Sequence, residues 1–257
     1  YNTYANANAL SAAMKRAGFD SVFILGVDYA YGRMLGTDFK RFVEKTGSKV
    51  AGEAWHPLNT MDFSSFLLQA QGSGAKAIAL ADSGNDLVSV IKEANEFQIT
   101  KKQTLVALAS INLSEIEALG LSTAQGLMTM SAFEWTKTDE SRRWAKAFLA
   151  RTGKFPTADQ AATYSEVRHY LKAVAAAQSL EPGPVMAKMR ELPVNDAFAT
   201  NGHLREDGQM VHDLYLVQVK SPAESTEKGD VLSIVQELRG DDVFQTLAES
   251  ACPLVKK

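Results

Sequence analysis

Polar and aromatic side chains follow four short apolar runs of the sequence, and these residues are the best placed to bind a small molecule. Each apolar run is predicted to be a strand of one parallel sheet, and ligands of open parallel sheets bind outside the carboxyl ends of the strands. Carboxylates, hydroxyls and tyrosine rings at such an edge can hold a ligand by a few hydrogen bonds and by ring contact. Two of the stretches also begin predicted helices, whose free N–H groups can receive an anion. The stretches are residues 28–31 (DYAY), 56–60 (HPLNT), 82–86 (DSGND) and 110–115 (SINLSE).

Several of these residues are candidate ligand contacts, each with an alternative role. Tyr29 and Tyr31 could present their rings to a ligand or could simply cover the end of the sheet. Phe133, in the stretch FEW after another apolar run, could contact a ligand or pack between domains. Asp82 could lie at the same edge as the tyrosines, whereas Asp86 is better explained as a helix cap.

The sequence lacks the motifs that carry common catalytic and cofactor chemistry. No G-x-G-x-x-G follows the first predicted strand, so a dinucleotide site of the usual kind is not supported. No G-x-x-x-x-G-K-[ST], H-E-x-x-H or G-x-S-x-G is present, and the four histidines have no metal-ligand spacing. We therefore expect no catalytic residues, no cofactor and no metal.

The composition is that of an ordinary globular protein. The 257 residues carry a formal net charge of -3, without the basic excess that binding to nucleic acid would use. No apolar run approaches the ~20 residues that are needed to span a bilayer. Cys252 is the only cysteine, which excludes an internal disulfide and a cysteine-cluster zinc site.

The order of the predicted elements indicates a parallel α/β lobe. Residues 19–108 alternate short β-rich runs with longer amphipathic segments, which is the pattern of consecutive β-α-β units. Right-handed crossovers would place the amphipathic segments on the faces of the sheet. The predicted strands cover residues 21–27, 48–57, 75–81 and 103–110, and the predicted helices cover residues 32–47, 60–74 and 83–98.

A different pattern follows residue 135. Three helices are predicted, over residues 139–151, over residues 158–179, and from residue 183 or 184 to residue 192, with nothing strand-like among them. They could be a small appendage packed on the first lobe, or they could belong to a second α/β lobe that has lost its N-terminal half. Further strands are predicted over residues 210–219 and 231–238. The middle helix has an apolar stripe that needs a partner surface, formed by Ala161, Tyr164, Val167, Leu171, Val174 and Ala175.

The order of these pieces resembles a known family. Residues 26–99, from GVDYAYGRM to EFQI, look like the C-terminal lobe of the type I periplasmic solute-binding proteins of ABC transporters, in the branched-chain amino-acid-binding family. The stretches HPLNTMDFSSFLLQAQ and NGHLREDGQMVHDLYLVQVK are most similar to the subgroup whose ligands include aromatic acids and related carboxylates. With PTADQAATYSEVRHYLKAV and the ending CPLVKK, the resemblance covers essentially the whole chain.

The resemblance implies an α/β fold with two lobes, each a parallel sheet flanked by helices, and a ligand enclosed between them by hinge closure. Residues 1–130 would form the first part of the C-terminal lobe, and residues 131–199 would be the helical remainder of the N-terminal lobe. Residues 200–257 would return to the C-terminal lobe. Roughly the first third of a usual member, with the sheet of its N-terminal lobe, is then expected to be absent. Because members of the subgroup carry a cysteine just upstream, the resemblance also suggests a disulfide between Cys252 and that absent segment.

The resemblance also suggests roles for single residues. Tyr31 matches the aromatic residue that faces the cleft in the family, and Ser83 falls where many members place an aromatic residue. Ser110 falls near the acidic residue with which amino-acid binders hold the ligand's ammonium group, which favours a ligand that has a carboxylate but no amine. Asp82, nearby, could still take a cation. The expected ligand-binding residues are Tyr29, Tyr31, Asp82, Ser83, Ser110 and Phe133.

The function that the resemblance implies is that of the periplasmic solute-binding component of an ABC importer, not an enzyme. It would bind a small carboxylate, either an aromatic acid or an amino-acid-like molecule, and a membrane permease would recognise its closed form. Two alternatives stay open. One is a ligand-sensing domain of the same fold in a receptor or regulator, and the other is a small α/β hydrolase, which would need a nucleophile and a base meeting at the sheet edge.

Overall fold

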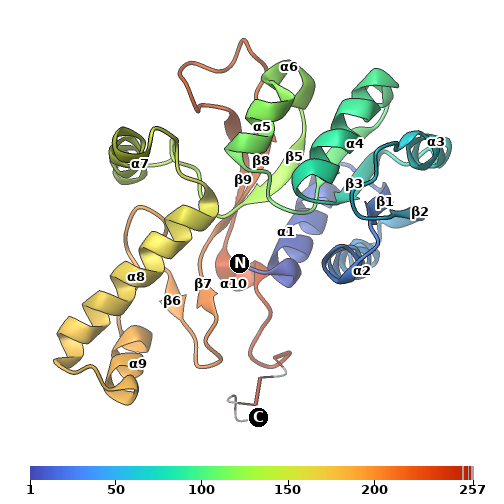
Figure 1. Cartoon of the computed structure of the whole chain (residues 1–257). Helices are drawn as coiled ribbons and strands as arrows, with labels where there is room; N and C mark the ends of the chain where they lie inside the picture. The colour runs from blue at the N-terminus through green and yellow to red at the C-terminus, as the bar shows by residue number, and fades with distance from the viewer. Residues whose placement is uncertain (251, 254, 256–257) are drawn as a thin grey trace. The chain divides into compact units, whose positions relative to one another are not determined.

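The computed structural model describes residues 1–250, 252–253 and 255, which divide into two compact units (Figure 1). One unit contains residues 2–131 and 216–236, and is called here the α/β unit. The other contains Tyr1, residues 132–215 and the described residues from 237 onward, and is called here the helical unit. Each unit is described by itself.

The α/β unit is built on a seven-stranded sheet in the order β2-β1-β3-β4-β5-β8-β9. β1 pairs in parallel with β2 and β3, and β4 pairs in parallel with β3 and β5. The register aligns Val27 with His56 and Gly26 with Ala81, so the first three of these strands end at one edge. The strands are β1 (Ser21–Val27), β2 (Lys49–His56), β3 (Ala77–Ala81), β4 (Thr104–Ala107), β5 (Met128–Ser131), β8 (Leu214–Val219) and β9 (Leu232–Leu238).

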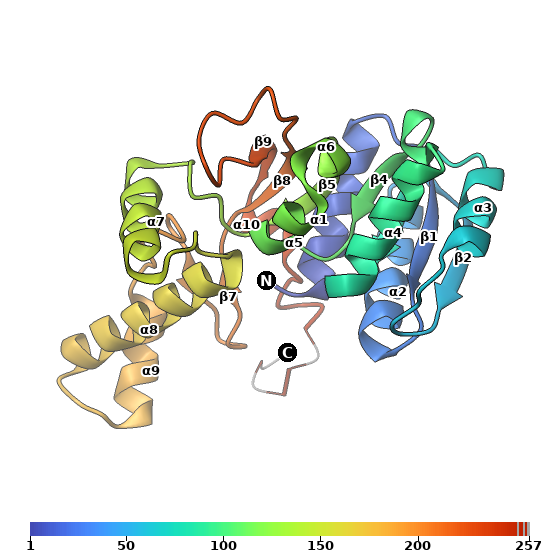
Figure 2. The ribbon, with the colours of Figure 1, turned by 45° about the horizontal axis from the view of Figure 1, so that its top comes forward.

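Helices pack on both faces of this sheet (Figure 2). On one face, Phe23 and Leu25 of β1 and Ile78 and Leu80 of β3 share a buried cluster with apolar residues of α3, α4, α5 and α6. The other face is covered by α2, which contacts β1 and β3, and by α1, which contacts α2 and β5. The helices are α1 (Thr3–Arg16), α2 (Ala30–Lys45), α3 (Ser64–Gly72), α4 (Gly84–Glu96), α5 (Leu113–Leu119) and α6 (Leu121–Ala124), with the short 3-10 helix η1 (Ile99–Lys101).

Close approach of α2 to the end of β1 requires a glycine at position 32. A Cβ on Gly32 would lie 2.3 Å from the carbonyl oxygen of Val27 and 3.1 Å from that of Ala81. Backbone atoms cannot move aside as the end of a flexible side chain can, so a larger residue would push the first turn of α2 away from the sheet. Gly32 therefore fixes where Tyr29 and Tyr31, at the start of the same helix, stand relative to the strand ends.

The helical unit contains α7 (Asp139–Thr152), α8 (Ala158–Ala177), α9 (Pro182–Glu191) and the short α10 (Gly240–Val243). Thr157 begins α8 with a capping box, in which its hydroxyl accepts from the N–H of Gln160 and its own N–H donates to the Gln160 side chain. Among its described residues the unit has one small separate sheet, the antiparallel pair β6 (His203–Leu204) and β7 (Met210–Val211).

Most predicted elements are confirmed in type and order, including the three helices α7, α8 and α9 with no strand between them in the described residues. The single strand predicted over residues 210–219 is wrong, because the chain forms β7 and β8 with His212 and Asp213 between them. The His212 ring is buried against Phe198 and Phe244, and the Asp213 carboxylate accepts from the N–H of Gly240. Because of these contacts, His212 and Asp213 belong to neither strand.

Candidate ligand-binding site

The candidate site is the edge of the α/β unit where β1, β2 and β3 end. The segments that follow these strands are joined to one another by hydrogen bonds. The N–H of Asp28, after β1, donates to the carbonyl oxygen of His56 at 2.7 Å, and the N–H of Asn59, after β2, donates to the carboxylate of Asp86 at 3.1 Å. This edge is therefore a braced surface and not a set of independent loops.

Glu115 connects two further segments of the same edge. Its carboxylate accepts from the N–H of Gly84 at the start of α4 and, at 2.7 Å, from the N–H of Asn112 at the start of α5. Asp28 has a different role, since it forms an exposed ion pair with Arg33 at 2.7 Å. The carboxylates of Asp86 and Glu115 thus hold the edge together, and Glu115 is a bracing residue that the sequence analysis did not identify.

A buried histidine–aspartate pair lies beneath this edge. His56 and Asp82 have no exposed surface, and His56 Nε2 lies 2.8 Å from Asp82 Oδ1. The other ring nitrogen, Nδ1, lies 2.9 Å from the carbonyl oxygen of Pro57, which can only accept, so Nδ1 carries a proton. Asp82 was expected to contact a ligand, but the structure places it under the surface as the partner of His56.

Burial and pairing act in opposite directions on the two groups. Burial lowers the pKa of His56, but the hydrogen bond to Asp82 and the charge of that carboxyl raise it by more, so the pKa of His56 lies above its ordinary 6.5. Burial raises the pKa of Asp82 above its ordinary 3.8 by more than His56 lowers it. Together the two groups hold a proton more tightly than they would in water.

Four of the expected contact residues lie at or near the surface of the edge. Tyr29 precedes the first turn of α2 and is 41% exposed, and its ring centroid lies 6.2 Å from that of the half-buried Tyr31. Ser83 is exposed where α4 begins, and Ser110 is partly buried before α5. The side chain of Tyr29, which precedes α2, makes no capping hydrogen bond. The edge therefore combines two tyrosine rings, two hydroxyls and the N-terminus of α2.

Phe133 lies elsewhere, inside the helical unit. It is 6% exposed, and its ring meets the edge of Trp144 at 5.7 Å and stacks on Phe198 at 6.5 Å between centroids. These contacts give Phe133 a packing role within its own unit.

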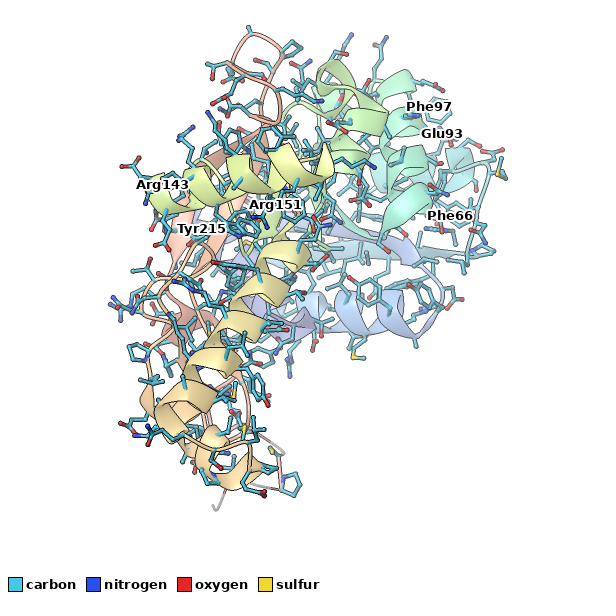
Figure 3. The ribbon with its side chains drawn as sticks, turned by 60° about the vertical axis from the view of Figure 1, so that its left-hand side comes forward. Phe66, Glu93, Phe97, Arg143, Arg151 and Tyr215 are labelled. Carbon is cyan, nitrogen blue, oxygen red and sulfur yellow. The ribbon has the colours of Figure 1, made fainter. Side chains whose placement is uncertain are left out.

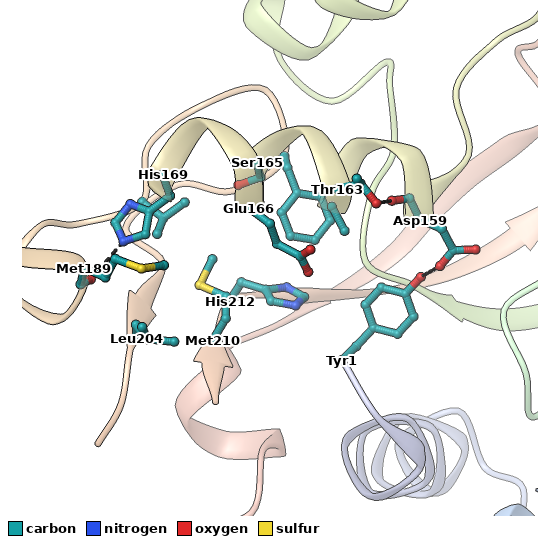
Figure 4. Close-up of a pocket in the computed structure, with 13 residues that line it drawn as sticks. Tyr1, Asp159, Thr163, Ser165, Glu166, His169, Met189, Leu204, Met210 and His212 are labelled. Atoms are coloured by element: carbon teal, nitrogen blue, oxygen red, sulfur yellow. Dashed lines mark hydrogen bonds between the residues drawn. The ribbon is translucent and has the colours of Figure 1, made fainter. Parts of the chain in front are cut away.

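A second hollow, which the sequence analysis did not identify, lies in the helical unit (Figure 4). It is a cavity of about 370 Å³ beside α8, where the Tyr1 hydroxyl donates to Asp159 and His169 Nε2 lies 2.8 Å from the carbonyl oxygen of Met189. Burial lowers the pKa of His212 in its wall to about 4, so this ring is neutral at pH 7. The lining combines apolar side chains with the polar side chains of Asp159, Ser165, Glu166 and His169. None of these residues belongs to the predicted apolar stripe of α8, so the sequence pattern did not indicate the cavity.

Three further observations limit the chemistry. No helix in the described part of the chain combines the length and apolar content that a membrane span requires. Within the same residues, histidine, cysteine, aspartate and glutamate side chains nowhere gather in threes as a metal site. Cys252 is a partly buried free thiol among the described residues, and its pairing with a cysteine of another segment stays a prediction.

Comparisons with known proteins identify the family to which this chain belongs. A family model described as "Periplasmic binding protein" matches residues 1–228. A crystal structure of a periplasmic binding protein from Burkholderia mallei is 42% identical with a TM-score of 0.91, and covers 100% of this chain and 68% of its own. A branched chain amino acid ABC transporter periplasmic ligand-binding protein from Burkholderia xenovorans is 33% identical with a TM-score of 0.95 and the same coverage.

More distant proteins share the fold. A solute binding protein of an ABC transporter from R. palustris, solved in complex with 4-hydroxybenzoate, is 18% identical with a TM-score of 0.78, over 93% of this chain and 66% of its own. Leu/Ile/Val-binding protein homolog 8 of Brucella melitensis is 22% identical over 186 residues, which are 70% of this chain. The chain spans about half the length of the curated relatives it matches.

Proposed function

Because the chain belongs to the periplasmic binding protein family, of the branched-chain amino acid ABC transporter type, we propose that it is part of the extracytoplasmic solute-binding component of an ABC importer. The proposed ligand is a small carboxylate without an α-amino group, such as an aromatic acid. The proposed location is the periplasm, and the proposed partner is the transporter's membrane permease.

The single observation that carries the proposal is the composition of the strand-end edge. The rings of Tyr29 and Tyr31 lie at the N-terminus of α2, so an aromatic ring could stack on a tyrosine while a carboxylate lies at the positive end of the helix dipole. Ser110 supplies a hydroxyl where an acidic residue would attract an amine. In support, the fold relative from R. palustris was solved with 4-hydroxybenzoate.

Binding at this edge would also explain how a transporter senses the ligand. A ligand that contacts the α/β unit and a second lobe gains both sets of contacts only when the lobes are closed, so it shifts the hinge equilibrium toward the closed form. The edge itself is braced by Asp86 and Glu115, so little of the binding free energy is needed to order it.

The test is calorimetric titration of the chain with 4-hydroxybenzoate, benzoate and leucine. We expect the two aromatic acids to bind more tightly than leucine, and Tyr31→Ala to weaken aromatic-acid binding about tenfold, since one lost aromatic contact is worth ~1.4 kcal/mol. Phe97→Ala is the matched control, because Phe97 is 43% exposed at the opposite end of α4. Equal binding by the two variants, or no binding of either aromatic acid, would contradict the proposal.

A further inference from the structure

A cavity of about 240 Å³ lies in the α/β unit, apart from the candidate ligand-binding site. Thr104 and Met128 in its wall are the first residues of the parallel strands β4 and β5, so it lies where these strands begin. The candidate site lies at the other edge, where strands of the same sheet end. The cavity is called here the amino-end cavity, and its polar side chains include Asn95, Gln103, Thr104, Gln125 and Gln218.

Helix α4 connects the candidate site with the amino-end cavity. It begins at Gly84, whose N–H donates to the bracing carboxylate of Glu115. The last two turns of the same helix supply Ile91 and Asn95 to the wall of the cavity. Figure 3 labels Phe97, which directly follows α4 at this end. A ligand in the amino-end cavity would therefore use a different set of residues from a ligand at the candidate site.

The wall of the amino-end cavity offers amide and hydroxyl groups without charge. Its polar side chains come from asparagine, glutamine and threonine. No aspartate, glutamate, lysine, arginine or histidine is among the described residues that line it. A charged ligand would lose hydration in this cavity without gaining an ion partner. The wall therefore favours a neutral ligand.

Gln103 leaves one buried acceptor of this wall without a donor. Its side chain donates from Nε2 to the carbonyl oxygens of Ala70 and Ala75, at 3.1 and 2.8 Å. These two acceptors identify the nitrogen of the amide, so Oε1 is the remaining atom. Oε1 is buried, and nothing in the described part of the chain donates to it. A buried acceptor without a donor lowers stability, and a ligand hydroxyl that reached it would remove that cost.

Two exposed glutamines also present their amide oxygens. Gln125 Nε2 donates to the carbonyl oxygen of Ser122 at 2.9 Å, and Gln218 Nε2 donates to that of Gly126 at 3.2 Å. These bonds hold the nitrogen of each amide on the backbone and leave its oxygen as the acceptor for a ligand. The wall is thus rich in acceptors, and it suits a molecule that donates several hydrogen bonds.

Apolar side chains complete the amino-end cavity. Ile91, Leu105 and Leu127 line it and are buried, and the partly buried Phe19 adds an aromatic ring. Such surfaces pack against the C–H groups of a ligand's carbon skeleton. The volume lies below the roughly 300 Å³ at which pockets for drug-sized ligands begin, so the skeleton has only a few carbon atoms.

We propose that the amino-end cavity is a second binding site, which takes a small neutral polyol. The hydroxyl groups of the polyol donate to the amide oxygens of Gln103, Gln125 and Gln218, and its carbon skeleton packs on the apolar side chains. The proposal does not depend on the proposed function, because this ligand has no carboxylate and meets other residues.

The experiment is titration of the isotopically labelled chain with erythritol, a four-carbon polyol, followed by amide chemical shifts. We expect saturable shifts at Thr104, Gln125 and Gln218, with a Kd on the order of 10 mM, as suits a ligand of so few atoms. The amides of Tyr29 and Tyr31 should not move. Tartrate is the matched control ligand, since it has the same carbon number but carries two carboxylates, and it should not shift the residues of the cavity.

A pair of variants tests the contact with an amide oxygen. Gln218→Met keeps the length of the side chain but removes its amide, so it should weaken erythritol binding about fivefold through the loss of one hydrogen bond. Gln69→Met is the matched control, because Gln69 is an exposed residue of α3 outside the cavity. Binding of erythritol to this control should equal that of the native chain.

Three results would overturn the proposal. They are the absence of saturable shifts with erythritol, equal shifts with tartrate, and equal binding by the two variants. Titration of the Gln218→Met variant with 4-hydroxybenzoate keeps the two proposals apart, because its affinity for the aromatic acid should equal that of the native chain. A chain that binds erythritol but no aromatic acid would contradict only the proposed function.

Discussion

At the residue scale, the buried pair of His56 and Asp82 determines how the strand-end edge is supported. The pair lies where β2 and β3 end, and its loss would leave a polar group without a partner under the segments that follow both strands. The hydrogen bond to His56 gives Asp82 a structural role, and its contact with a ligand stays a prediction. The residue type of Asp82 suits ligand binding, but only the fold shows that its carboxylate is buried against His56.

The first prediction concerns this pair. Asp82→Asn should lower the free energy of unfolding by about 3 kcal/mol, because it removes one partner of a buried charged pair. Asp28→Asn, which breaks the exposed ion pair with Arg33, should have a much smaller effect. Urea unfolding followed by circular dichroism measures both variants, and equal losses would contradict the assigned role.

The same pair makes a signed pH prediction. The pKa of folded His56 is raised above 6.5, so its stabilising contribution is complete below pH 6.5 and is lost as the pH rises through the folded value. The raised pKa of Asp82 likewise makes the folded state less stable as the pH rises. The stability gap between the native protein and Asp82→Asn should therefore narrow as the pH is raised above 6.5. A gap that widens over this range would show that the pair does not hold the proton.

The next prediction concerns how Ser110 determines the class of ligand. Ser110→Asp places a carboxylate where we expect the α-carbon substituents of a ligand to lie, so it should improve binding of leucine relative to 4-hydroxybenzoate by about tenfold or more. Competitive titration of the two ligands measures the ratio. Ser114→Asp, a serine-to-aspartate change four residues later within α5, is the control and should leave the ratio unchanged.

At the element scale, the contact between α2 and β1 positions the tyrosines. Gly32→Ala should destabilise the protein by about 1–3 kcal/mol, because its Cβ would clash with the carbonyl oxygens of Val27 and Ala81. Gly72→Ala is the matched control: Gly72 also lies in a helix and has no atom near the added Cβ, so the change should be neutral or mildly stabilising. Thermal unfolding measures both, and similar shifts in Tm would contradict a specific role for Gly32.

The alternation of strands and helices was predictable, because buried apolar residues follow a different sequence pattern in strands than in helices. Residues 77–81 are apolar throughout and form the fully buried interior strand β3, and the apolar spacing of residues 84–96 matches α4. The break between β7 and β8 was not predictable. It depends on the contacts of His212 with Phe198 and Phe244, which lie far from it in the sequence.

At the scale of the whole molecule, the sequence predicted three helices without strands among them, and the structure confirms this order in the described residues. The apolar stripe of α8 was expected to need a partner surface, and in the structure Val167 and Leu171 of this stripe are more than half exposed. The bracing contacts of the binding edge could not be predicted, since Glu115 reaches Gly84 across 31 positions of the chain. The packing of Phe133 on Trp144 and Phe198 could not be predicted either, because only folding brings these rings together, and its contact with a ligand stays a prediction.

The central claim is that the strand-end edge of the α/β unit binds a small carboxylate. The most direct test is titration of the isotopically labelled chain with 4-hydroxybenzoate, followed by amide chemical shifts. We expect saturable shifts at Tyr29, Tyr31, Ser83 and Ser110, with no change along α9 (Pro182–Glu191). Shifts that are absent, or that are confined to the cavity beside α8, would contradict it.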